Sequence, residues 1–139
     1  MSCGREDARG TVEGMTTPTE QAADLGARRA RQYLDLADAG RTDEAQFLIS
    51  AVADPRELVY VGAGFTALAR MVSRTLPPAM RAQATGRQSQ LAQLRDRHRG
   101  DVDGLRSWLR QAGDEVLTVA RLAEPDPAAR RRLLDLPAS

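Results

Sequence analysis

The residues with the clearest potential for chemistry form the run Gly62-Ala63-Gly64-Phe65-Thr66-Ala67, which follows the apolar stretch Leu58-Val59-Tyr60-Val61. The order G-x-G-x-x-A is the glycine pattern that cradles a dinucleotide pyrophosphate in a Rossmann fold. That function also needs a strand before the glycines, a second strand after the helix, and an acidic residue about 20 positions further on. No Asp or Glu occurs between Leu58 and Arg95, and Pro77-Pro78 interrupts the unit. The sequence therefore favours a buried helix over a dinucleotide site.

Other reactive side chains are few. His98 is the single histidine and lies in the charged stretch LRDRHRGD, where a positive imidazole suits the end of a helix. Cys3 is the single cysteine and lysine is absent, which excludes an internal disulfide, a Schiff-base lysine and a Walker A loop. Asp35 and Asp38 are spaced as on one helix face, but no Glu-x-x-His motif accompanies them. We expect no catalytic residue, no cofactor and no metal, and hence no enzyme.

Charge is distributed unevenly along the chain. All 20 basic residues are arginines, which is typical of the codon bias of a G+C-rich bacterial genome. Residues 1–57 carry a net charge of −4, residues 58–100 a net charge of +6, and residues 101–139 a net charge of −1. The basic segment could bind phosphate groups, or it could pair with the acidic helices of the same chain or of a second protomer. The candidate anion- or nucleic-acid-binding residues are Arg81, Arg87, Arg95, Arg97 and Arg99.

The elements that position these residues are predicted to be helices. Thr17-Pro18-Thr19-Glu20 has the form of a capping box, which predicts a helix as far as Ala39 with Gly40 behind it. Asp54-Pro55-Arg56-Glu57 repeats the start signal. Further helices are predicted over residues 43–53 with Thr42 as the cap, over 79–99, from Asp101 or Asp103 to residue 123 without a break at Gly113, and over 128–134.

The helix that begins at Pro55 has two faces of different character. Its bulky apolar residues recur every three or four positions as far as Leu76, which is the period of a helix and not of a strand. A second stripe consists of small residues, and no charge occurs on any face from Leu58 to Ala69. Such a helix is either packed closely by its neighbours or forms a self-association surface. The candidate packing and self-association residues are Gly62, Thr66, Ala69 and Ser73.

These elements predict an all-α fold, an antiparallel bundle of about four long helices plus two short ones. Residues 16–137 are expected to form a single domain, and residues 1–15 a disordered N-terminal extension. Residues 36–55 resemble the turn region of a tetratricopeptide repeat, but the period needed for a repeat array is absent. There is no signal peptide pattern and no apolar run of 18 residues, so we expect a cytoplasmic protein without membrane contact.

The sequence predicts a function in binding rather than in catalysis. We expect a non-enzymatic protein-interaction domain, an adaptor or regulator, that self-associates as a homodimer or larger homo-oligomer. One alternative is a small nucleic-acid-binding regulator that uses the basic helix over residues 79–99. Another alternative is a helical bundle that binds a small molecule.

Overall fold

A computed structural model describes residues 17–138. Helices occupy 80% of these residues, and no strand occurs among them. The all-α prediction is therefore confirmed, and the predicted helix ends lie within a few residues of those observed. The predicted disorder of residues 1–15 falls outside the described residues. The helices are α2 (Pro18–Asp38), α3 (Thr42–Ser50), α4 (Pro55–Ser73), α5 (Pro78–Arg97), α6 (Val102–Ala123) and α7 (Pro127–Leu133).

Local hydrogen bonds explain where the helices begin and end. At the start of α2, the Thr17 hydroxyl accepts from the Glu20 backbone N–H at 3.1 Å and the Glu20 carboxylate accepts from the Thr17 N–H at 3.2 Å, which confirms the capping box. The start of α3 was predicted less well, because Thr42 is the first helical residue and not the cap. Gly40 and Gly100 have φ of 79° and 85°, a backbone conformation that residues other than glycine rarely adopt. These two glycines lie in the turns that follow α2 and α5.

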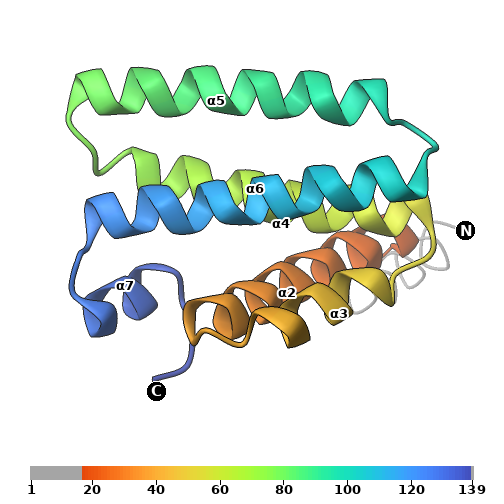
Figure 1. The fold of residues 1–139 in the computed structure, drawn as a ribbon, viewed down its shortest axis with the longest axis horizontal. Coiled ribbons are helices and arrows are strands. Elements are labelled where there is room, and N and C mark those ends of the chain that lie inside the picture. Colours follow the sequence, from red (N-terminus) through yellow and green to blue (C-terminus); the bar gives the residue numbers. More distant parts are fainter. Residues whose placement is uncertain (1–16, 139) are drawn as a thin grey trace, which may run out of the picture.

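The chain reverses direction at each connection from α2 to α6, so consecutive helices are antiparallel (Figure 1). The most extensive packing, however, joins α4 to α2 on one side and to α6 on the other, and these three helices run in the same direction. The core is thus formed by three parallel helices, α2, α4 and α6, although α2 and α4 are each antiparallel to the helix that follows in the chain. Helices α3 and α5 run in the opposite direction and connect them. The order of the residues in contact agrees, since Gly26 lies beside Tyr60 and Ala30 lies beside Gly64 one turn later.

Glycines allow α4 to approach both of its neighbours. A Cβ atom on Gly64 would lie 2.9 Å from the Cβ of Ala30 in α2, and one on Gly26 would lie 2.6 Å from the backbone of Tyr60. On the other side of α4, a Cβ atom on Gly62 would lie 1.9 Å from the indole ring of Trp108 in α6. The glycines of the apparent nucleotide motif are therefore packing residues in the middle of a helix, and they have no strand before them.

Helix α6 continues through Gly113, as predicted. The glycine at this position leaves room for the ring of Tyr33, which comes within 2.6 Å of the place that a Cβ on Gly113 would take. Tyr33 also meets Phe65 edge to face, with ring centroids 5.4 Å apart. Burial, together with the negative charge of Asp114, raises the pKa of the Tyr33 phenol. These aromatic rings join α2, α4 and α6 at the centre of the core.

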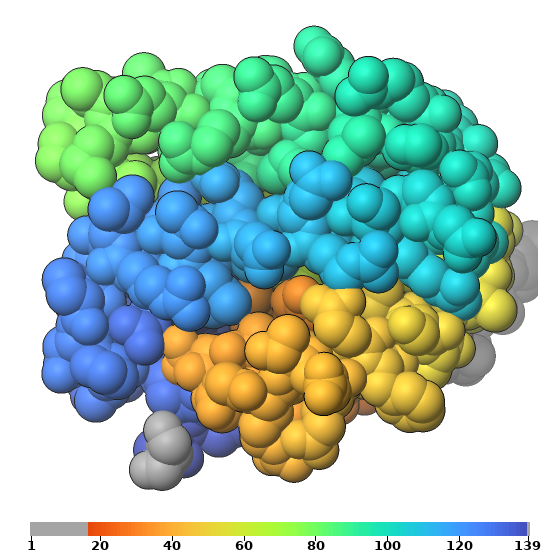
Figure 2. Space-filling model, in the orientation of Figure 1, coloured from red at the N-terminus to blue at the C-terminus, as the bar shows by residue number. Residues whose placement is uncertain are grey.

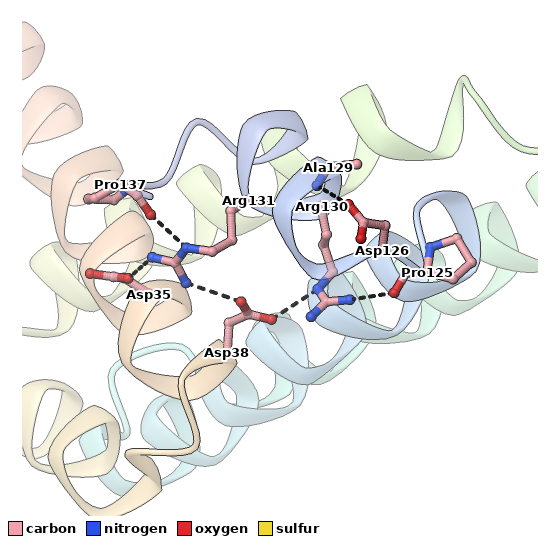
Figure 3. A network of polar contacts seen from close by, with 8 residues as sticks. All are labelled: Asp35, Asp38, Pro125, Asp126, Ala129, Arg130, Arg131 and Pro137. Carbon is pink, nitrogen blue, oxygen red and sulfur yellow. Dashed lines mark hydrogen bonds and ion pairs between the residues drawn. The ribbon is translucent and has the colours of Figure 1, made fainter. Parts of the chain in front are cut away.

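A network of ion pairs attaches the C-terminal helix α7 to the end of α2 (Figure 3). Asp38 accepts from Arg130 Nε at 3.0 Å and from Arg131 Nη1 at 3.1 Å, and its side chain is only 4% exposed. Arg131 also binds the Asp35 carboxylate and donates to the Pro137 carbonyl at 2.6 Å. The two carboxylates noted in the sequence thus have guanidinium partners from α7.

Candidate functional site: helix α5 and the cleft beneath it

Helix α5 differs from the other long helices in how little of it is buried. Of its 20 residues only Ala84 is buried, whereas the 19 residues of α4 include seven buried ones. Met80, Leu91 and Leu94 are partly buried and provide its apolar contacts with the core. In the space-filling view, α5 forms the outer layer of the molecule along the length of α6 (Figure 2).

The outward face of α5 is uncharged as well as exposed. Gly86 lies near its middle, and no heavy atom comes within 4 Å of the position that a Cβ there would occupy. Between Arg81 and Arg95 the single charged residue is Arg87, which is half-buried on another side of the helix. We call the following exposed residues the outer stripe of α5: Ala82, Gln83, Gly86, Gln90 and Gln93.

The five candidate anion-binding arginines do not form one surface. Arg81 donates to the Leu76 carbonyl at 3.2 Å, and Arg87 Nε donates to both carboxylate oxygens of Glu115 at 2.8 Å. Arg95 and Arg97 are two residues apart and so point about 200° away from each other around the helix. Arg97 has no ion pair among residues 17–138.

Arg95 and Arg99 are held together by one carboxylate. Arg95 Nε and Arg99 Nη2 each donate to Oδ1 of Asp96 at 3.1 Å. The hydrogen bond from Arg95, with a smaller effect of Arg99, lowers the pKa of Asp96 below its ordinary value. Asp96 thereby offsets one of the two positive charges of Arg95 and Arg99.

The predicted stripe of small residues on α4 faces its own chain. The side chain of Trp108 in α6 packs directly against Gly62, and Ala69 is buried. Thr66, Ala69 and Ser73 line a cavity of about 330 Å³ between α4, α5 and α6. The indole ring of Trp108, from the same chain, occupies the space beside Gly62.

We call this cavity the inner compartment, and a second hollow, with which it shares Arg95, the outer compartment. The walls of the inner compartment carry polar groups from three helices, including Gln88 and Ser89 of α5 and Glu115 of α6. The Glu115 side chain is 10% exposed and is neutralised by Arg87. The inner compartment therefore has a mixed polar and apolar lining, and its buried carboxylate is already paired within the chain.

The outer compartment, of about 510 Å³, lies where the start of α4 meets the end of α5. Pro55, Val59 and Tyr60 of α4 and Leu105 of α6 supply an apolar floor. Three arginines are among its lining residues, and one of them, Arg95, also borders the inner compartment. These arginines are Arg56, Arg95 and Arg99.

Sequence reasoning identified Arg95 and Arg99 but missed Arg56. In the sequence, Arg56 is only part of a helix start signal, and its proximity to the end of α5 depends on the tertiary arrangement. The nearest signal was the excess of positive charge in residues 58–100, which begins two positions after Arg56.

Other kinds of site have less support. Among residues 17–138, no three His, Cys, Asp or Glu side chains come together in a way that could hold a metal ion. His98 Nδ1 lies 3.1 Å from Oδ2 of Asp101 in the turn after α5. None of the helices in this part of the chain combines the length and the apolar character needed to cross a membrane.

No protein-family model, curated protein or solved structure matches this chain.

Proposed function

We propose that this chain is a non-enzymatic protein-interaction domain, an adaptor or regulator, that self-associates through the outer stripe of α5. One observation supports this proposal above all others: α5 is long and regular, yet it buries a single residue and carries a single charge between Arg81 and Arg95. A helix in water is normally stabilised by packing of one face or by several i,i+4 ion pairs. Packing against a second helix would supply the missing stabilisation.

The chemistry of the outer stripe suits a second α5 in the antiparallel direction. Gly86 removes the side chain at the centre, where two helix backbones would come closest. Gln83, Gln90 and Gln93 can donate and accept hydrogen bonds across such a contact. A parallel pair would place Arg97 beside Arg97 of the partner, whereas an antiparallel pair keeps the basic ends apart. The resulting contact is isologous, as in most homodimers.

The placement of the arginines favours a protein partner over nucleic acid. Phosphate binding along α5 would need several unpaired arginines on one face. Arg87 is paired with Glu115, Arg95 and Arg99 share Asp96, and Arg97 points to a different side from Arg95. The outer stripe between these arginines is uncharged and can take part in hydrogen bonds but not in charge pairing.

Sedimentation velocity over a range of concentrations from the micromolar upward tests the proposal. We expect a monomer–dimer equilibrium that Gly86→Arg shifts to monomer, because the substitution places bulk and like charge at the centre of the contact. The matched control is Ala67→Arg, at an exposed position of α4, which should leave the dimer unchanged. A wild-type protein that remains monomeric throughout would contradict self-association. A dimer that survives Gly86→Arg would contradict the surface.

The nucleic-acid alternative is tested by titration with mixed-sequence duplex and single-stranded DNA at low salt. We expect no binding. Binding that weakens steeply with added salt, and whose salt dependence is reduced by replacing Arg95, Arg97 and Arg99 with Gln, would favour that alternative instead.

A further inference from the structure

We infer that the outer compartment binds a small organic anion that combines an aromatic body with a single carboxylate or phosphate group. The compartment lies at one end of α5, and the outer stripe faces away from it. The inference is therefore independent of the proposed self-association. It rests on an apolar hollow of suitable size and on three arginines that line it, one from the start of α4 and two from the end of α5 and the turn after it.

The floor of the compartment has the dimensions and chemistry of a site for an aromatic body. Its volume of about 510 Å³ falls within the range of small-molecule sites, which are mostly apolar with a few polar groups at fixed positions. Val59 and Tyr60 occupy adjacent positions in α4 and are half-buried, while Leu105 is fully buried beneath them. The phenol ring of Tyr60 provides a flat surface against which a second ring can stack.

The charges around the hollow favour an anion. Arg56 comes from the first turn of α4, Arg95 from the last turn of α5, and Arg99 from the turn that follows. Guanidinium groups bind carboxylate and phosphate through two parallel hydrogen bonds, and these are stronger than neutral ones.

The nearby carboxylates leave this positive charge largely uncompensated. Asp96 neutralises one charge and keeps Arg95 and Arg99 side by side. Asp54 accepts from the Arg56 backbone N–H at 2.9 Å, and Glu57 accepts from Arg29 of α2 at 2.8 Å. The three arginines carry three positive charges, and Asp96 offsets one of them. An organic anion would offset part of the remaining positive charge.

Binding can be measured on the full chain by isothermal titration calorimetry at low salt. The test ligands are naphthalene-1-carboxylate, phenyl phosphate, the neutral naphthalene-1-carboxamide, and inorganic phosphate. We expect saturable binding of one or both aromatic anions. The carboxamide should bind about tenfold more weakly or worse, because it lacks the charge-assisted hydrogen bonds. Inorganic phosphate should also bind more weakly, because it has no apolar body to cover Val59 and Tyr60.

The double variant Arg56→Gln/Arg99→Gln should weaken the aromatic anions at least about tenfold and leave the carboxamide unchanged. Both residues are exposed, so the variant should fold, and circular dichroism checks that it does. Arg121→Gln, at an exposed position near the end of α6, is the matched control for a change of charge. Chemical-shift changes in a two-dimensional NMR spectrum should centre on Val59, Tyr60 and Gly100.

Three results would overturn the inference. They are the absence of saturation by either aromatic anion, equal affinity for the carboxamide, and equal loss of affinity in the Arg121→Gln control. A failure of self-association would leave these ligand measurements unaffected, because the compartment and the outer stripe lie on different faces of α5. The double variant changes only the compartment, so its sedimentation should match that of the wild type.

Discussion

Trp108 occupies the space that a side chain at position 62 would need, and its indole is 3% exposed. At the scale of single residues, this contact gives Gly62 a role that intrinsic helix propensity alone cannot explain. A glycine inside a helix costs about 1 kcal/mol relative to alanine. Gly62 and Gly86 both incur this cost, but Gly62 has a large ring beside it and Gly86 has open space. The two positions therefore predict opposite responses to the same substitution.

Gly62→Ala should lower the free energy of unfolding by about 1–3 kcal/mol, because the added methyl group forces the indole or the backbone to move. Gly86→Ala should raise it by about 0.5–1 kcal/mol in the monomer, because the methyl group meets nothing and helix propensity improves. Urea denaturation at low protein concentration measures both values. A Gly62→Ala variant as stable as the wild type would contradict the close contact with Trp108.

At the scale of elements, ion pairs join α7 to α2, and Leu134 directly after α7 is buried in the core. Arg130 and Arg131 are nearly buried, and Asp38 lies between them (Figure 3). Removal of one member of a buried ion pair leaves an uncompensated charge, which costs far more than the pair itself contributes. The stability of α7 thus depends on a carboxylate in a different helix.

Asp38→Ala should lower the free energy of unfolding by about 3–5 kcal/mol, because two buried guanidinium groups lose their shared partner. The control is Glu44→Ala, which removes an exposed carboxylate paired with Arg41 and should change little. Thermal unfolding followed by circular dichroism compares the two variants. An Asp38→Ala protein as stable as the control would show that solvent reaches the pair.

The sequence was informative about elements whose signals are local. Thr17 and Asp54 with the prolines that follow them marked two helix starts, and Gly40 marked an end, because caps and stops depend on adjacent residues. The contacts of Asp38 with Arg130 and Arg131 span 92 and 93 positions, and no local pattern indicates them. The outer compartment could not be predicted for the same reason, since Arg56 meets Arg95 and Arg99 only in the folded chain.

At the scale of the whole molecule, stability should be distributed unevenly. Helices α4 and α6 contribute most of the buried residues, whereas α5 lies over a partly polar cleft. Regions with few buried apolar contacts open locally at a lower free energy than the rest of the protein. We therefore expect α2, α4 and α6 to form the most stable part of the molecule, and α5 to open locally at a lower free energy.

Amide hydrogen exchange at concentrations that favour the monomer should reveal this distribution. We expect the amides of α4 and α6 to exchange through global unfolding, and those of α5 to exchange faster through local opening. Protection of α5 should increase at concentrations that favour the dimer, if the outer stripe is the contact. Equal protection of α4 and α5 in the monomer would contradict the weak attachment of α5.

The attachment of α7 to α2 also has a consequence for the order of events during synthesis. The ribosome releases the last turn of α2 long before it adds Arg130 and Arg131, so Asp35 and Asp38 must remain hydrated while α3 to α6 emerge. Domains fold as units while the chain grows. The acidic pair therefore gains its guanidinium partners only after α2 to α6 have been made.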